Sequence, residues 1–518
     1  MNQFAETAEG ASAVLETAIV GAGFGGMGLA IKLQQAGHSD FHIFEKATDV
    51  GGVWRDNVYP GAACDVPSHL YSFSFEPNPH WSRSFGGQAE IHDYLQHCAD
   101  KHRLWEKIRF NAEIEALVFD ENASLWTLHI AGGDRVRARA VVLAVGALNI
   151  PAYPGIAGLD KFEGKVMHTA EWDADYDLSG KRVGVIGTGA SAIQVVPSIQ
   201  PEVCELKLFQ RTAPWVMPKH DGWISPRWRK RYERFPLLQK LHRTIQYWMF
   251  ESVAPVMIKN NWMTRIAERL GHRYIRRMIK DPLLREKITP SYALGCKRVL
   301  LSDDYYPALT KANVDVVTEG IACIDEQGVV GRDGSRTELD VLILATGFKV
   351  PVAGAPFRIE GPGGRVLDDD WRGGSEAYLG MSVSGYPNLL YIMGPNTGPG
   401  NISVIFYIES QLRYILGYLA HLRKRNIATL DLKEQAQREF NKTIQEKMQR
   451  TTWTSGCDSW YLTEDGKNTT LWPGYSWQYR MQSRDFDVSV YNSRRLKPAS
   501  VMELSENISS ESGQVLSS

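Results

Sequence analysis

Two glycine-rich turns carry the clearest chemistry in this sequence. Gly21-x-Gly23-x-x-Gly26 follows a short apolar run, and Gly187-x-Gly189-x-x-Ala192 follows a second one. Glycines at this spacing permit a tight turn, close approach of the backbone to a pyrophosphate and close packing of a helix on a strand. The helix that follows points its N-terminal dipole at the phosphates. The spacing therefore predicts two dinucleotide-binding sites, and alanine is tolerated in the third place.

The residue that ends the second strand of each site distinguishes the two cofactors. The stretch 41–45 ends in Glu45, and an acid there accepts hydrogen bonds from free ribose hydroxyls. The stretch 206–210 is followed by Arg211 and Thr212, and Arg211 stands as far past its turn as Glu45 does. A guanidinium pairs well with a 2′-phosphate. We expect FAD at the first site and NADPH rather than NADH at the second, unless Arg211 is an ordinary surface arginine.

The elements that must position these residues alternate between strands and helices. Apolar runs predict strands at 17–21, 41–45, 125–130, 139–146, 181–187, 206–210, 340–346 and 388–393, and helices at 27–35 and 405–424. Between 221 and 289 the strand and glycine signals stop, and aromatic and aliphatic residues recur at helical spacing among Arg and Lys. The members of this stripe are Trp228, Tyr232, Phe235, Leu238, Leu241, Ile245 and Trp248. We expect buried core, with a substrate-tunnel wall or a membrane-contacting surface as alternatives.

Length and pattern together predict the domain organisation, because 518 residues exceed one ordinary domain. The predicted fold class is α/β, with two Rossmann-like dinucleotide-binding domains. Residues 1–150 and 351–500 form the FAD domain, and the second part includes a substrate-side loop. Residues 151–220 and 290–350 form the NADPH domain, which the helical insertion 221–289 interrupts. The Ser- and Glu-rich tail 501–518 is predicted to be disordered.

Composition excludes several classes of function. Lys and Arg number 58 against 59 Asp and Glu, so no nucleic-acid partner is indicated. The six cysteines are scattered and form no Cys-x-x-Cys, which argues against a metal site, a disulfide framework and the disulfide reductases. No signal peptide and no apolar run of about 18 residues is present. We expect a cytoplasmic protein without a transmembrane segment, and either a monomer or a dimer is compatible with the sequence.

Two further stretches resemble the fingerprints of the Baeyer–Villiger monooxygenases. Between the two turns lies Phe162-x-Gly164-x-x-x-His168-x-x-x-Trp172-Asp173. After the first turn comes Gly51-Gly52-x-Trp54, followed by Tyr59-Pro60-Gly61-x-x-x-Asp65. The resemblance extends from residue 17 to about 474, with both fingerprints intact. It implies a class B flavoprotein monooxygenase of type I, which depends on FAD and NADPH.

The resemblance also implies roles for single residues. Trp54 is implied to face the flavin, and Asp65 to contact a catalytic arginine. Gly295-x-Lys297-Arg298 is similar to the element whose lysine holds the 2′-phosphate and whose arginine, here Arg298, is catalytic. Gly394-Pro395-Asn396 is similar to a flavin-side loop, so Asn396 is implied to bind cofactor. Residues 456–461 and 471–474, with Trp472, resemble a substrate-side loop that is a candidate lid.

Each implied role has a structural alternative. Asp65 is alternatively a turn residue that caps a helix, and Lys297 with Arg298 an exposed pair of cations. Phe162 and Trp172 alternatively fill a core, with His168 merely hydrogen-bonded in an ordinary linker.

The implied reaction uses NADPH and O₂ to form a C4a-peroxyflavin, which converts a ketone to an ester or lactone. The cofactor carries that chemistry, while the protein supplies positioning, exclusion of water and positive charge. Trp172-Asp173 favours ketone oxygenation, because the related flavin-containing S- and N-monooxygenases carry Tyr or Phe there. S- or N-oxygenation, an NADPH oxidase or flavin reductase, and a non-enzymatic dinucleotide sensor are the alternatives. The identity of the ketone depends on loops and on the insertion, whose packing does not follow from sequence.

Overall fold

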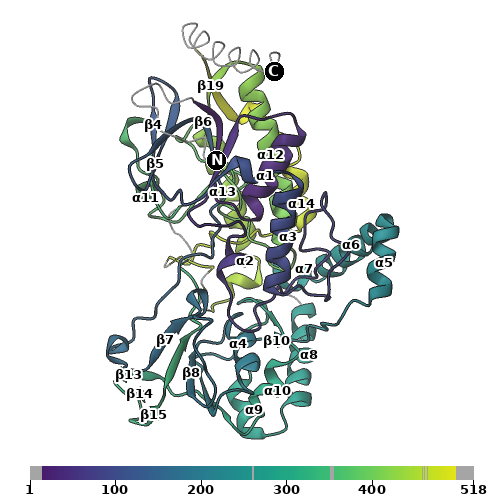
Figure 1. Cartoon of the computed structure of the whole chain (residues 1–518), viewed down its shortest axis with the longest axis vertical. Coiled ribbons are helices and arrows are strands. Elements are labelled where there is room, and N and C mark those ends of the chain that lie inside the picture. The colour runs from purple at the N-terminus through teal and green to yellow at the C-terminus, as the bar shows by residue number, and fades with distance from the viewer. Residues whose placement is uncertain are drawn as a thin grey trace.

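Two β-sheets organise the chain, for which a computed structural model describes residues 14–259, 262–349, 355–457, 459, 461–463 and 465–496. One sheet has the strand order β17-β4-β5-β6-β1-β2-β3 with β18 beside β6, and the other has the order β12-β9-β8-β16-β7. Figure 1 shows the first in the upper half of the view and the second in the lower half. The predicted α/β fold class with two Rossmann-like units is confirmed. The predicted tail 501–518 lies outside the described residues.

The first sheet is built around β1, which pairs in parallel with β2 on one side and β6 on the other. Its strands are β1 (Leu15–Val20), β2 (Phe41–Phe44), β3 (Ile108–Arg109), β4 (Ile114–Asp120), β5 (Leu125–Ile130), β6 (Arg135–Leu143), β17 (Arg358–Glu360) and β18 (Leu389–Tyr391). The surrounding elements are α1 (Phe24–Gln35), α2 (Val53–Asp56), α3 (Gln88–Lys101), α11 (Leu367–Asp370), α12 (Val404–Lys424), α13 (Glu434–Met448), α14 (Ser476–Gln482), β19 (Ile427–Leu432) and β20 (Tyr491–Arg495). Helix α12 packs against α1, so distant parts of the sequence complete one core.

The second sheet repeats this plan around β8. Its strands are β7 (Lys165–His168), β8 (Arg182–Ile186), β9 (Glu205–Phe209), β12 (Val314–Val317) and β16 (Val341–Leu344), all paired in parallel. Beside them lie α4 (Ala192–Ile199), α10 (Tyr305–Leu309), the pair β10 (Val216–Met217) and β11 (Leu300–Leu301), and the small sheet β13 (Ile321–Asp325), β14 (Gly328–Gly331) and β15 (Arg336–Glu338). The fingerprint segment contributes the edge strand β7, in which His168 is paired with Leu344.

The predicted insertion is helical, as expected. It consists of α5 (Pro226–Arg234), α6 (Pro236–Glu251), α7 (Ala254–Ile258), α8 (Trp262–Met278) and α9 (Pro282–Ile288). Figure 1 shows α5 and α6 projecting sideways from the body of the molecule. The prediction that the aromatic stripe is core is wrong for most of its members: Tyr232 is buried, but Trp228, Phe235, Leu241, Ile245 and Trp248 are exposed. Periodicity identified an apolar face, but it could not indicate whether that face points toward the protein.

One prediction from the cysteines is also wrong. Cys296 and Cys457 form a disulfide, with Cα atoms 6.2 Å apart and a sequence separation of 161. Pairing over such a distance leaves no local spacing from which it could be predicted. The bond joins the segment just before Lys297 and Arg298 to the predicted substrate-side loop. Among the described residues, no group of His, Cys, Asp and Glu could hold a metal ion, and no helix is long and apolar enough to cross a membrane.

Candidate active site

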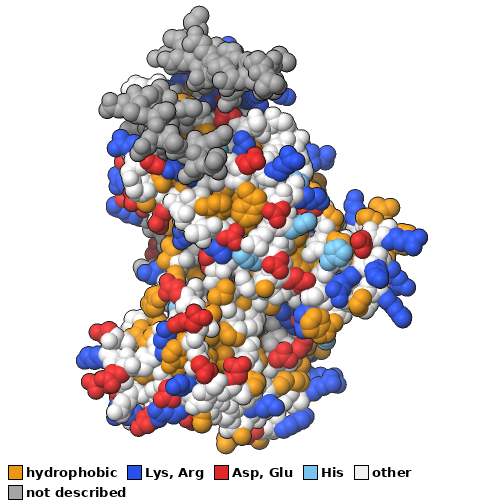
Figure 2. Space-filling view, viewed as in Figure 1, with side chains coloured by type: hydrophobic (Ala, Val, Ile, Leu, Met, Phe, Trp, Pro, Cys, Tyr) orange, Lys and Arg blue, Asp and Glu red, His pale blue; other side chains and the backbone are white. Residues whose placement is uncertain are grey.

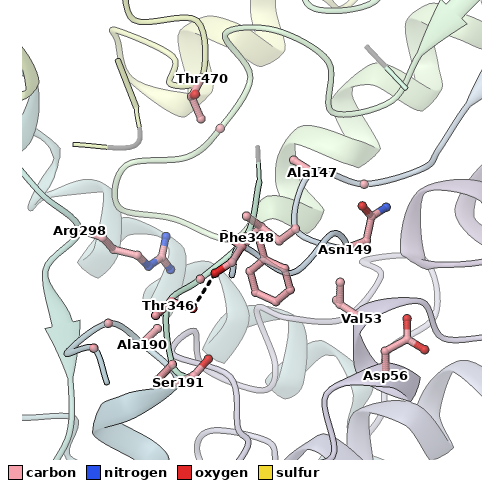
Figure 3. A pocket seen from close by; sticks show the side chains of 18 of the residues that line it. Val53, Asp56, Ala147, Asn149, Ala190, Ser191, Arg298, Thr346, Phe348 and Thr470 are labelled. Atoms are coloured by element: carbon pink, nitrogen blue, oxygen red, sulfur yellow. Dashed lines mark hydrogen bonds between the residues drawn. The ribbon is translucent and has the colours of Figure 1, made fainter. Parts of the chain in front are cut away.

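A cavity of about 1670 Å³ lies where the two nucleotide folds meet, and residues of both line it. Gly21, Gly23 and Glu45 come from the first fold, and Gly187, Gly189 and Arg211 from the second. Figure 3 shows Val53 and Asp56 on one side of this cavity, with Ala190, Ser191 and Arg298 on another. The two glycine turns therefore face one space.

The first turn is shaped by close backbone contacts. Gly21 has a φ of +102°, and a Cβ there would lie 2.6 Å from the carbonyl oxygen of Ala144. A Cβ on Gly26 would lie 1.9 Å from the carbonyl oxygen of Gly21, so the third glycine allows α1 to pack on the turn. The nearest atom to a Cβ on Gly23 would be 3.9 Å away. This middle glycine presents bare backbone to the cavity, which suits a pyrophosphate.

Glu45 directly follows β2 and contacts that turn. Its Oε2 accepts a hydrogen bond from the Ala22 amide at 2.8 Å, and its Oε1 accepts from the Ala47 amide at 3.0 Å. Arg55 Nη1 lies 3.1 Å from Oε1. The carboxylate is buried but lines the cavity, and its contact with a ribose stays a prediction.

The second turn has the same geometry with different side chains. Gly187 has a φ of +115°, and a Cβ there would lie 2.3 Å from the carbonyl oxygen of Ala345. Ala192 begins α4 and is buried away from the cavity wall, like Gly26 in the first fold. The Thr188 hydroxyl donates to the Thr212 carbonyl at 3.0 Å. Arg211, Thr212 and Lys297 line the cavity together, so the residues predicted to hold a 2′-phosphate lie around one space.

An ion pair joins the two folds within the cavity. Arg298 Nη2 lies 2.6 Å from Asp65 Oδ2, and Arg298 Nε donates to the same oxygen at 3.1 Å. Burial by itself would raise the pKa of Asp65, but the Arg298 guanidinium outweighs burial and the pKa lies below its usual range. The Asp65 carboxylate in turn raises the pKa of Arg298. The pair is therefore charged at neutral pH. Asp65 binds Arg298 rather than capping a helix, and Arg298 is paired with a carboxylate rather than being one of two exposed cations.

Aromatic residues form much of the wall near this pair. Trp54 lines the cavity, and its Nε1 donates to the Tyr71 hydroxyl at 3.0 Å. Tyr461 lines the cavity and is buried, and burial raises its pKa to about 12 although Arg298 opposes that shift. The motif comparison drew attention to the stretch that contains Tyr461, but not to this residue. Trp460 of the same stretch lies outside the described residues.

A second bridge between the folds was missed by sequence reasoning. The Tyr59 hydroxyl donates to Gln194 Oε1 at 2.9 Å, and Gln194 Nε2 donates to the Ala63 carbonyl at 2.9 Å. Gln194 lies on α4 of the second fold, whereas Tyr59 and Ala63 belong to the fingerprint loop of the first. The signal for Tyr59 was its place in the Tyr-Pro-Gly motif. Gln194 had none, because a single glutamine on a helix has no spacing to interpret.

The linker fingerprint lies away from the cavity wall. Phe162 is buried in the core of the second sheet, and a Cβ on Gly164 would lie 2.6 Å from the Phe162 ring. Trp172 packs on the other face of that sheet, and Asp173 Oδ2 lies 2.5 Å from Lys165 Nζ. None of these residues lines the cavity as the structure describes it. These fingerprint residues therefore pack on the two faces and at the edge of the second sheet, and the role predicted for them between the folds stays a prediction.

His168 is buried at the end of β7. Its Nδ1 accepts a hydrogen bond from the Ala170 amide at 3.1 Å, and its ring lies 5.6 Å from the Tyr153 ring and 6.1 Å from the Phe348 ring. Burial lowers the pKa of His168, so the imidazole is neutral at neutral pH. Tyr153 and Phe348 both line the cavity. The histidine thus lies behind two residues of the wall, at the end of the edge strand of the second sheet.

Asn396 and Trp472 are not on the cavity wall. The Asn396 amide N–H donates to the Thr469 carbonyl, and its side chain donates to the carbonyls of Asn468 and Leu471 at 2.8 and 3.1 Å. Trp472 is buried against Tyr479, and its Nε1 donates to the Tyr475 carbonyl. Their neighbours Gly394, Pro395 and Leu471 do line the cavity. The Trp472 Nε1 and the Asn396 Nδ2 are thus bonded to the adjacent loop, whereas the buried Asn396 Oδ1 accepts no hydrogen bond within the part of the chain that the structure describes.

Comparison with known proteins supports this description. A family model described as pyridine nucleotide-disulphide oxidoreductase matches residues 18–247. A Baeyer–Villiger monooxygenase of Pseudomonas aeruginosa is 49% identical over 479 residues, covering 92% of this chain and 91% of that protein. One of Streptomyces coelicolor is 46% identical over 489 residues, covering 94% of both.

Solved structures agree with the sequence relatives. The closed crystal structure of cyclohexanone monooxygenase has a TM-score of 0.84 and 28% identity, covering 94% of this chain and all of that one. Oxidized steroid monooxygenase bound to NADP has a TM-score of 0.82 and 28% identity, covering 93% and 99%.

Two nucleotide folds that face one cavity and lack a Cys-x-x-Cys define a flavoprotein oxidoreductase with a nicotinamide cofactor. The family within this class is identified by relatives that are nearly half identical to the chain over nine-tenths of its length. The chain belongs to the Baeyer–Villiger monooxygenases, and it is an FAD- and NADPH-dependent monooxygenase.

Proposed function

We propose that the chain oxygenates a ketone at Arg298, within the cavity where the two nucleotide folds meet. The observation that carries this proposal is the contact of Arg298 with Asp65, because it brings a permanently charged donor from one fold into the cavity and fixes it with a carboxylate from the other. Figure 3 displays the Arg298 side chain reaching toward the centre of that cavity.

The wall residues divide into two cofactor sites. Gly21, Gly23 and Glu45 would hold the pyrophosphate and ribose of FAD, with Trp54 beside the flavin. Gly187 and Gly189 would hold the pyrophosphate of NADPH. Arg211, Thr212 and Lys297 would surround its 2′-phosphate. When bound, FAD and NADPH together with O₂ supply the oxygen atom that is inserted beside the ketone carbonyl.

The protein's own contribution is electrostatic and positional. A guanidinium has five N–H donors, and Asp65 takes the Nε donor and one on Nη2, which leaves donors for an anionic oxygen in the cavity. The charge on Arg298 persists at any working pH, so the donor is present before negative charge develops. Asp65 acts as a positioning residue through Arg298. Tyr461 and Trp54 both line the cavity, where their rings would help to exclude water.

The domain plan follows from these contacts. Residues 1–150 and 351–500 would bind FAD, residues 151–220 and 290–350 would bind NADPH, and 221–289 would be an insertion with a separate role. The linker residues Phe162, Gly164, His168, Trp172 and Asp173 would govern how the two folds meet. Dependence on NADPH, an intracellular cofactor, supports a cytoplasmic location.

A product analysis tests the proposal directly. The FAD-loaded enzyme is supplied with NADPH, O₂ and a panel of linear, cyclic and aryl ketones and sulfides, and the products are identified by mass. We expect esters or lactones at a gain of one oxygen atom, with sulfoxides as a secondary product. Sulfoxides or N-oxides without any ester would favour the S- or N-oxygenation alternative. NADPH consumption that yields only hydrogen peroxide would favour an oxidase and overturn the proposal.

A further inference from the structure

Helix α6 is amphipathic, but its apolar face points to solvent and its polar face points to the protein. Its apolar residues recur at spacings of three and four, so they share one face. That face is open to solvent: Leu237 is 80% exposed, Leu241 56%, Ile245 49%, Trp248 56% and Met249 61%. Isolated exposed apolar residues are ordinary, but a contiguous face of large ones marks an interaction surface.

The opposite, polar face of α6 anchors the helix to the body of the enzyme. Gln239 is buried and donates to Asn78 O at 2.7 Å, and Arg243 donates to Ser72 O at 2.9 Å. Four and eight residues further on, Tyr247 lies 3.0 Å from the Ser476 hydroxyl and the buried Glu251 accepts from the Ser476 amide at 2.7 Å. Since four successive turns are bonded in this way, the helix cannot rotate to bury its apolar face.

Helix α5 adds a dense positive charge beside this face. Tyr232 of α5 is bonded to His242 of α6 at 2.7 Å, so the two helices form one arm, residues 225–251. The cations of α5 are Arg227, Arg229, Lys230, Arg231 and Arg234, against the single acid Glu233. Within the part of the chain that the structure describes, no carboxylate forms an ion pair with any of these five. Figure 2 shows hydrophobic and basic side chains together on the projecting arm.

Aromatic residues lie among these cations. The Arg231 guanidinium lies 4.8 Å from the Trp228 ring, and the Arg234 guanidinium lies 5.6 Å from the Phe235 ring. Exposed aromatic, aliphatic and basic side chains on one helical element are the combination that settles at a bilayer interface, with apolar groups among the acyl chains and cations among the headgroups.

We propose that the arm 225–251 docks the enzyme on an anionic lipid bilayer. The net charge of the whole chain is −1, so the attraction is local to the arm. A second copy of the chain fits this surface less well, because a two-fold symmetric dimer through this arm would gather the five cations of both copies in one interface. Docking requires no membrane-spanning helix, since the apolar residues come from one face of a surface helix. The inference does not depend on which substrate the enzyme oxidises.

Sedimentation with vesicles tests the proposal on the FAD-loaded enzyme. Binding is measured to phosphatidylcholine vesicles with and without phosphatidylglycerol, at low and high NaCl concentration. We expect binding to the anionic vesicles that is more than roughly tenfold tighter than to the neutral ones, because each cation near an anionic surface contributes roughly fivefold. High NaCl should weaken it.

Variants separate the two components of the surface. Leu237→Ser with Leu241→Ser should weaken vesicle binding by roughly tenfold or more, and Lys230→Glu with Arg234→Glu should do so by at least as much. Leu283→Ser is the matched apolar control, since Leu283 on α9 is 72% exposed, and Lys442→Glu with Lys447→Glu on α13 is the charge control. Retained flavin absorbance and turnover of a water-soluble ketone report that each variant is folded.

Three outcomes would overturn the proposal. One is wild-type enzyme that does not sediment with anionic vesicles. Another is binding that the arm variants and the control variants lower equally. The third is a concentration-dependent dimer in sedimentation velocity that Leu237→Ser with Leu241→Ser abolishes while vesicle binding is absent, which would identify a second copy as the occupant.

Discussion

The two nucleotide folds of this enzyme use one backbone design for two ligands. In each, a buried parallel strand runs into a glycine with φ above +100°, and a Cβ at that glycine would meet the carbonyl oxygen of the alanine that directly follows a neighbouring strand. The first helical hydrogen bond is also equivalent: the Met27 amide donates to Gly23 O, and the Ile193 amide to Gly189 O. The backbone of the turn is therefore set by sterics and is independent of which nucleotide binds.

The folds differ in how the strand end is tied to the turn. In the first, the acid Glu45 accepts from the turn amide of Ala22, so the group that is predicted to contact ribose also stabilises the turn. In the second, the Thr188 hydroxyl ties the turn to the Thr212 carbonyl. Because threonine ties this turn, the position next to Thr212 is available for Arg211, which we propose selects a phosphate. On that proposal, the two sites share one backbone geometry and differ in specificity through their side chains.

The largest expected effect comes from removing the group that joins the folds. Arg298→Ala should lower ester formation by about 10² to 10³, the typical loss for a preorganised donor to an oxyanion. FAD should stay bound, and NADPH should still be consumed with release of hydrogen peroxide. Product mass analysis and a peroxide assay measure both. Near-normal ester yield from this variant would remove Arg298, and with it Asp65, from the reaction.

Arg211 tests whether the second fold selects its nucleotide by charge. Arg211→Ala removes a charge-assisted contact to phosphate, worth roughly 1.5–3 kcal/mol, and should raise the KM for NADPH about ten- to a hundredfold. The KM for NADH should barely change. Arg211→Glu, which introduces the acidic residue found at the equivalent position of the first fold, should have a larger effect and make the enzyme prefer NADH to NADPH. An equal loss for both nucleotides would show that Arg211 does not contact the 2′-phosphate.

An exchange of the third residue between the two turns tests the shared frame. Gly26→Ala puts a Cβ 1.9 Å from Gly21 O and should lower the free energy of unfolding by about 1–3 kcal/mol, the usual cost of overpacking. Ala192→Gly in the second fold should cost about 1 kcal/mol or less. Denaturant titration of the FAD-loaded enzyme measures both. An equal loss of unfolding free energy in the two variants would show that the first turn does not require glycine at position 26 more than the second requires alanine at position 192.

The smallest expected effect concerns the linker. His168→Ala removes the acceptor of the Ala170 amide behind Tyr153 and Phe348, and should lower turnover and coupling roughly two- to thirtyfold through altered contact of the folds. FAD binding should be unchanged. His168→Asn retains a side-chain acceptor and should recover much of the loss. Unchanged coupling in His168→Ala would make this histidine an ordinary core residue.

Sequence alone was sufficient wherever the determinants are local. The turns at Gly21 and Gly187 are specified by residues a few positions apart, because a positive φ and a short contact admit only glycine. Strand ends follow from the same local pattern, so Glu45 and Arg211 could be assigned before their surroundings were known. The contact of Asp65 with Arg298 was predictable only by resemblance, since 233 residues separate the two.

Tertiary structure alone decided which face of an element meets which partner. Helical periodicity located α6, but its orientation depends on hydrogen bonds to distant parts of the chain. The carbonyls of Ser72 and Asn78 accept from side chains of α6, and the Ser476 amide donates to one. Asn396 and Trp472 lie behind the cavity wall for the same reason, because the Asn396 Nδ2 and the Trp472 Nε1 donate to neighbouring loops. The Cys296–Cys457 disulfide likewise depends on a contact across 161 residues. Such contacts are set by the competition of many distant groups for burial and hydrogen bonds, and no local spacing encodes their outcome.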